Sequence, residues 1–181
     1  MSIPVTSTSA ALFLVLHLAT CGGDRTAERG ASDPALDGPS WAESTVTRAP
    51  AASTAVLTDV RFARHDGYDR FVLEFREHLP GYRIRYPPGL LHECGTGRAV
   101  ELDAPAALQI ELRRTAAHDR EGEATTEERE LAPGLPTLRD ARLTCDYEGI
   151  VEWVLGLEKQ VPFRVLTLQG PPRLVVDVRH R

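Results

Sequence analysis

The chain has 181 residues, of which 42% are hydrophobic and 26% charged, and its formal net charge at pH 7 is −5. These values are typical of one globular domain with an appendage, since single domains usually run to about 100 to 200 residues. They exclude a membrane-spanning bundle and a fully disordered chain. The excess of acid excludes a general nucleic-acid binder, which needs clustered basic residues.

The first feature along the chain is a short apolar run from Ala10 to Ala19. About ten residues is the length of a signal-peptide core, whereas a membrane-spanning helix needs about 20. The run ends in Leu18-Ala19-Thr20-Cys21, which resembles the lipobox of bacterial lipoproteins. The resemblance implies a signal peptide over residues 1–20 and a lipid on Cys21 that anchors the chain outside the cytoplasm, in the lipid bilayer of the cell membrane. The alternatives are an ordinary secretory signal, which gives a secreted protein, and a short buried helix with a chance cysteine.

The next segment, Gly22 to Thr54, is rich in Ala, Ser, Thr, Gly and Pro. It has few large apolar residues, so it cannot bury enough surface to offset the entropy of ordering the chain. We therefore predict a lipidated cysteine and a disordered linker over residues 21–54, in which Trp41 is a chance aromatic rather than a docking motif. The folded domain is predicted over residues 55–181.

Apolar and polar residues alternate in several short runs after Ala55. Alternation with period two predicts half-buried β-strands. Between the first two runs, the segment 65–69 reads HDGYD, and its Asp66-Gly67 pair predicts a tight hairpin. Turn signals about every ten residues predict an all-β fold, an antiparallel β-sandwich or an open barrel. The runs lie at 60–62, 71–75, 82–86, 108–112 and 174–178.

Two segments fit this pattern less directly. Residues 115–131 are charged and low in apolar side chains, which predicts a solvated insertion or hairpin tip. Residues 149–159 have apolar spacing that suits either a strand or a short helix. The interior Gly156 and the β-branched pair Ile150-Val151 favour a strand.

The two ends of this domain resemble a known family. Residues 59–75 read DVRFARHDGYDRFVLEF, and residues 171–178 read PPRLVVDV. Both segments resemble the AMIN-like domain of actinobacterial envelope lipoproteins, which is distantly similar to the AMIN domain of cell-wall amidases and secretins. The resemblance implies a small β-sandwich module that localises a protein in the envelope or binds peptidoglycan. It offers no catalytic residue to carry over.

Two polar groups in these end segments have alternative interpretations. His65, Asp66 and Asp69 suit a tight turn, and they also suit a metal or acid–base cluster. Arg173 and Asp177 fall on the polar face of the last predicted strand, four residues apart. They predict either a cross-strand salt bridge or a polar ledge that binds a carboxylate or a sugar.

Cys94 and Cys145 remain once Cys21 is assigned to the lipid. An even pair of cysteines in an exported domain predicts a disulfide, with two separate buried thiols as the alternative. A zinc site needs more ligands than His92 adds near Cys94, and no second Cys or His lies near Cys145. We predict no metal and no cofactor.

Enzyme motifs are absent from the sequence. There is no Gly-x-Ser-x-Gly elbow, no His-Glu-x-x-His and no phosphate-binding Gly-rich loop, and no serine follows Ser53. A pair of carboxylates that hydrolyses a glycan is a third interpretation, but acidic residues in such a chain are mostly solvated surface. The sequence therefore predicts a protein that is not an enzyme.

A binding role is predicted instead. Arg83 and Arg85 alternate with Tyr82 and Tyr86, whose rings are predicted to face the core. The arginines, if continuous with Arg61, form a candidate surface for the carboxylates of peptidoglycan. The alternative is a protein–protein interaction module of the envelope that touches no glycan. The candidate ligand residues are Arg61, Arg83, Arg85, Arg173 and Asp177.

Overall fold

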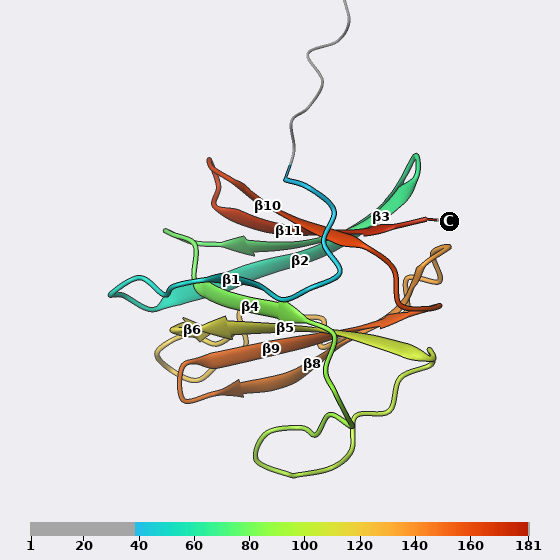
Figure 1. The fold of residues 1–181 in the computed structure, drawn as a ribbon. Coiled ribbons are helices and arrows are strands. Elements are labelled where there is room, and N and C mark those ends of the chain that lie inside the picture. The colour runs from blue at the N-terminus through green and yellow to red at the C-terminus, as the bar shows by residue number, and fades with distance from the viewer. Residues whose placement is uncertain (1–38, 181) are drawn as a thin grey trace, which may run out of the picture. The chain divides into compact units, whose positions relative to one another are not determined.

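The computed structural model describes residues 39–180, so the predicted signal peptide and Cys21 lie outside the described residues. The described chain folds into two mostly antiparallel sheets, which Figure 1 shows as layers. This confirms the predicted all-β fold class. No helix in the described range is long and apolar enough to cross a membrane.

The six-stranded sheet has the order β1-β4-β5-β9-β8-β7. The five-stranded sheet has the order β10-β11-β3-β2-β6. The strands are β1 (Val46–Arg48), β2 (Ala55–His65), β3 (Tyr68–Phe75), β4 (Gly81–Arg85), β5 (Ala106–Arg113), β6 (Thr115–Ala116), β7 (Glu130–Leu131), β8 (Leu138–Tyr147), β9 (Ile150–Leu157), β10 (Phe163–Leu168) and β11 (Arg173–Arg179).

The hydrophobic core lies between the two sheets. In β3, Phe71, Leu73 and Phe75 are each at most 1% exposed and alternate with more exposed residues. Ile84 of β4 and Trp153 of β9 are fully buried in the same core. The rings of Phe71 and Trp153 lie 5.6 Å apart and join the two layers. The period-two pattern in the sequence is therefore the inner face of each sheet.

The predicted hairpin connects β2 and β3. Gly67 has a φ of 80°, the left-handed conformation that a tight turn needs and that glycine adopts without strain. His65 pairs with Tyr68 across the turn, and Phe62 pairs with Phe71 further along. The turn thus sets the register that places the apolar residues of both strands on one face.

The segment with ambiguous spacing forms β9, as predicted. It lies between β5 and β8, and both Val154 and Leu155 are fully buried. The loop between β4 and β5 covers the outer face of β9, since a Cβ atom added to Gly156 would lie 3.0 Å from the Cβ of Ala104. Burial on both faces explains why the apolar spacing also matched a helix.

Residues 115–131 are only partly a solvated insertion. Thr115 and Ala117 are at most 1% exposed, and β6 pairs in parallel with the start of β2. The tip at residues 120–124 is exposed, as predicted for the whole segment. The start of the segment is built into the five-stranded sheet.

Part of the predicted linker is folded. Strand β1 pairs with β4, and Ala42 forms two backbone hydrogen bonds with Phe163 of β10, of 2.7 and 2.8 Å. In Figure 1 this segment runs from the edge of one layer to the edge of the other. Ordering this segment needs no large apolar residues, because the edge strands offer unpaired N–H and C=O groups. The ordered domain therefore begins before residue 55.

Candidate functional site

The predicted ligand residues lie on two opposite faces of the sandwich. Arg61, Arg173 and Asp177 are on the outer face of the five-stranded sheet, whereas Arg83 and Arg85 are on the outer face of the six-stranded sheet. Their inward neighbours Val60 and Ile84 both face the shared core. The expected surface that joins Arg61 to Arg83 and Arg85 does not form, because these strands belong to different sheets.

Arg83 and Arg85 are held by their neighbours on β5. Arg83 donates to Glu111 at 2.9 Å, and Arg85 donates to Gln109 at 3.0 Å. Gln109 in turn donates to Glu152 of β9 at 2.7 Å. Burial alone would raise the pKa of the Glu111 carboxyl. The hydrogen bond from Arg113 and the charges of Arg113 and Arg83 outweigh it, so the pKa is lowered. Arg83 and Arg85 are therefore already hydrogen-bonded to neighbouring side chains of the six-stranded sheet.

The tyrosines of this strand pack against the core, as predicted. Burial raises the pKa of Tyr82 and of Tyr86. The Tyr86 hydroxyl donates to the Val161 carbonyl at 2.6 Å and accepts from the Val161 amide at 3.1 Å. These partly buried rings therefore pack against the core as part of the fold.

Asp177 is a buried bridge on the other sheet. Its side chain is fully buried and accepts two hydrogen bonds from Arg70 of β3, at 2.7 and 3.0 Å, and one from Arg164 of β10, at 2.8 Å. The hydrogen bond to Asp177 raises the pKa of Arg70, which keeps the guanidinium charged. Arg173 instead donates to the Pro171 carbonyl at 3.4 Å. Asp177 thus ties three strands together and does not face a ligand.

A stack of rings and guanidinium groups extends from this bridge. The rings of His65 and Tyr68 lie 4.8 Å apart and nearly parallel. The guanidinium of Arg164 lies 4.8 Å from the centres of both Tyr68 and Trp41, and that of Arg179 lies 5.6 Å from Trp41. We call these five residues the aromatic stack. It packs Trp41, expected to be a chance aromatic in a linker, against the five-stranded sheet.

Substitution of Trp41 tests whether the aromatic stack holds this segment. We expect Trp41→Ala to lower the free energy of unfolding by about 1 to 2 kcal/mol, because it removes two cation–π contacts. Trp41→Phe, which keeps a ring, should lose less. Urea unfolding followed by the fluorescence of the buried Trp153 measures both variants. Equal midpoints for wild type and Trp41→Ala would show that the segment does not contribute.

The outer face of the five-stranded sheet is rich in arginine. We call it the arginine face, formed by Arg61, Arg70, Arg164, Arg173 and Arg179, with the carboxylates Asp59, Glu74 and Asp177 among them. Arg61 forms ion pairs with Asp59 and with Glu74, the latter at 2.7 Å, and the hydrogen bond to Glu74 raises the pKa of Arg61. Within residues 39–180, Arg173 and Arg179 have no carboxylate partner. They lie on one strand about 20 Å apart, at a rise of about 3.3 Å per residue.

The hairpin residues do not form a joint cluster. Asp69 is fully buried and accepts backbone N–H bonds from Thr137 and Leu138, at 2.7 and 2.9 Å. Its other oxygen lies 2.6 Å from Nε2 of His180. His65 belongs to the aromatic stack and Asp66 is exposed. No group of three or more metal-ligating side chains comes together in the described part of the chain.

The predicted disulfide is present. Cys94 and Cys145 are bonded, with Cα atoms 5.1 Å apart. The bond joins the loop between β4 and β5 to β8, and the Cys94 amide also donates to the Thr144 carbonyl at 3.0 Å. This confirms the pairing and shows its role, which is to hold the long loop against the six-stranded sheet.

Comparison with known families agrees with this fold. A family model for the AMIN-like domain matches residues 55–180, which span β2 to β11. The chain belongs to the AMIN-like domain family. AMIN-like domains are generally non-catalytic binding modules, related to the cell envelope and associated with peptidoglycan. No curated protein matches the chain. Strand β1 and Trp41 precede the matched region.

Proposed function

We propose that this protein is a non-catalytic lipoprotein, anchored through Cys21 on the extracytoplasmic face of the cell membrane, whose AMIN-like domain binds peptidoglycan. Three observations support the proposal: the membership of the family, the resemblance of residues 18–21 to a lipobox, and the arginine face. Its partners are then the lipid bilayer and the cell wall, with no cofactor.

The arginine face carries the binding proposal. Arg173 and Arg179 have no carboxylate partner in the described chain, so each guanidinium has donors left for a ligand. Guanidinium groups bind carboxylates with two parallel hydrogen bonds, and the stem peptides of peptidoglycan carry carboxylates. A spacing of about 20 Å suits an extended polymer better than a small molecule. Arg83 and Arg85 are weaker candidates, because they already donate hydrogen bonds to Glu111 and Gln109.

Co-sedimentation with isolated sacculi tests the proposed function. We expect the full-length protein, purified in detergent, to sediment saturably with sacculi that have been stripped of protein. Retention should fall as salt is raised, since exposed charge pairing is screened. If the protein is retained only on sacculi that keep their attached proteins, the alternative of a protein-interaction module is correct. Absence of retention on both preparations would overturn wall binding.

A further inference from the structure

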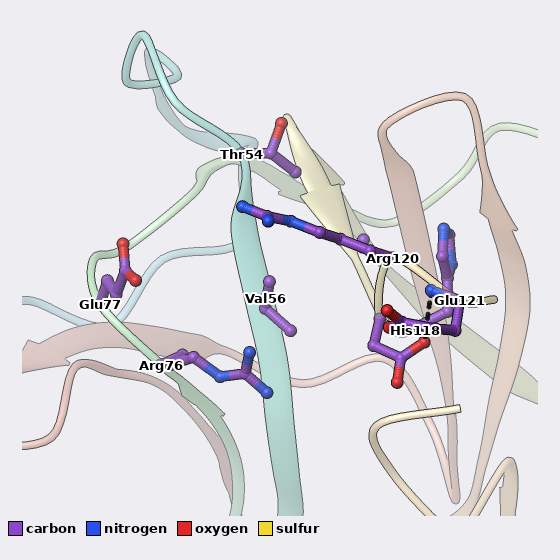
Figure 2. A pocket seen from close by; sticks show the side chains of 9 residues that line it. Thr54, Val56, Arg76, Glu77, His118, Arg120 and Glu121 are labelled. Carbon is purple, nitrogen blue, oxygen red and sulfur yellow. Dashed lines mark hydrogen bonds between the residues drawn. The ribbon is translucent and has the colours of Figure 1, made fainter. Parts of the chain in front are cut away.

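A pocket of about 540 Å³ is lined by none of the residues of the arginine face. Its walls are the loop after β3, with Arg76 and Glu77, and the loop after β6, with His118, Arg120 and Glu121. Val56 of β2 lies between them. Figure 2 shows the side chains of Arg76 and Arg120 reaching toward β2 near Val56 from its two sides. This volume is in the range of small-ligand sites, about 300 to 1,000 Å³.

The charges in this pocket are not neutralised by the fold. Arg76 and Arg120 form no ion pair with any residue between 39 and 180, although most arginines on the two sheets are paired. Glu77 and Glu121 likewise have no arginine or histidine partner in that range. The guanidinium groups of Arg76 and Arg120 both reach into the pocket and repel each other. A bound carboxylate would offset this repulsion by accepting charge-assisted hydrogen bonds from both. Three carboxylates, those of Glu77, Asp119 and Glu121, also line the pocket and favour an ammonium group.

His118 is fixed at the wall of the pocket. Its Nδ1 lies 2.9 Å from Oδ1 of Asp146, and this carboxylate also accepts the Ala117 amide at 3.0 Å. The Asp146 side chain is 6% exposed, so it holds the ring firmly. With Nδ1–H donated to Asp146, neutral His118 keeps Nε2 as an acceptor. An acceptor on the same wall as Glu121 suits a ligand that brings N–H donors.

We propose that this pocket binds a small zwitterionic ligand, with a carboxylate held by Arg76 and Arg120 and a primary ammonium held by Glu121 on the wall formed by the loop after β6. A free amino acid or a short peptide with both ends free has this chemistry. A phosphate or a dicarboxylate does not fit, because the carboxylates that line the pocket would repel it. No residue of the pocket belongs to the arginine face, so variants of the two sites can be tested separately.

Calorimetric titration of the full-length protein with the dipeptide alanyl-alanine, in both chiral forms, tests the proposal. We expect binding of at least one form at millimolar concentration. Acetylation of its amino end or amidation of its carboxyl end should weaken binding about tenfold or more, since each removes one of the two charges. Failure of both chiral forms to bind, or equal binding of the capped dipeptides, would overturn the proposal.

Paired variants connect this binding to the pocket. Arg76→Gln with Arg120→Gln should abolish binding of the dipeptide, whereas Arg48→Gln with Arg64→Gln, which removes the same charge from exposed strand positions, should leave it unchanged. Circular dichroism and a thermal melt establish that each variant is folded. If the Arg48 and Arg64 variant loses binding as much as the pocket variant, the dipeptide is bound by net charge and not in the pocket.

Discussion

Replacement of Asp69 with alanine is expected to lower the free energy of unfolding by about 3 to 5 kcal/mol. The carboxylate is fully buried and accepts hydrogen bonds from two backbone N–H groups, that of Leu138 at the start of β8 and that of Thr137 in the loop before it. Each amide left unsatisfied in the core costs about 1 to 3 kcal/mol. The loss of His180 as a partner, 2.6 Å away, adds to this cost. Asp69 therefore connects β3 of one sheet to β8 of the other.

Asp66→Ala is the matched control for this substitution. It removes the same group three positions away in the hairpin turn, where the side chain is exposed and forms no hydrogen bond within residues 39–180. Equilibrium unfolding in urea measures both variants against wild type, and Asp66→Ala should lose less than about 1 kcal/mol. If the two variants lose the same amount, Asp69 does not connect the sheets as the structure indicates.

Removal of the disulfide is expected to lower the free energy of unfolding by about 4 kcal/mol in the chain-entropy model. Cys94 and Cys145 are separated by 51 residues in sequence, so the bond restricts a long segment of the unfolded chain. It also holds the loop that covers Gly156 and β9, and this loop should become accessible to protease when the bond is absent.

The double variant Cys94→Ala/Cys145→Ala measures this contribution. Cys21→Ser is introduced into both the variant and its reference protein, so that the compared chains differ only in the disulfide pair. Urea unfolding gives the change in free energy, and limited proteolysis reports on residues 86–105. Equal midpoints for the two proteins, with equal cleavage of the loop, would show that the bond does not stabilise this fold.

Local pattern was enough to predict six strands of this domain, β2, β3, β4, β5, β9 and β11, whereas no predicted run covers β7, β8 or β10. In β3 and β11 the apolar residues recur at every second position, because only the inner face of each strand packs in the core. The Asp66-Gly67 turn was also predictable, since its conformation depends on its own residues. The strand assignment of β9 depended on Gly156 and its β-branched pair, which were sufficient despite burial on both faces.

The partners of polar residues were not predictable in the same way. Asp177 binds Arg70, 107 residues earlier in the chain, and Asp69 binds Leu138, 69 residues later. Such pairs depend on the order of strands in each sheet, which alternation does not determine. The same limit explains why Arg61 was grouped with Arg83 and Arg85, although it lies on the opposite face of the sandwich.

The folded part of the linker was missed for a different reason. Residues 41–48 contribute backbone hydrogen bonds to the edges of β4 and β10 and a single ring to the aromatic stack. Edge pairing of this kind needs few apolar residues, so composition indicated disorder. The signals available were Trp41 itself and the arginines of β10 and β11, which are able to pack against a ring.

The comparison of two charge-matched variants on protein-stripped sacculi tests the central claim most directly. Arg173→Gln/Arg179→Gln removes the two guanidinium groups of the arginine face that have no carboxylate partner within residues 39–180, and Arg83→Gln/Arg85→Gln removes the same charge from the opposite face. We predict that the first variant binds about tenfold more weakly than wild type while the second binds as wild type does. If both variants bind like wild type, or if the second is the one that loses retention, peptidoglycan is not bound through the arginine face.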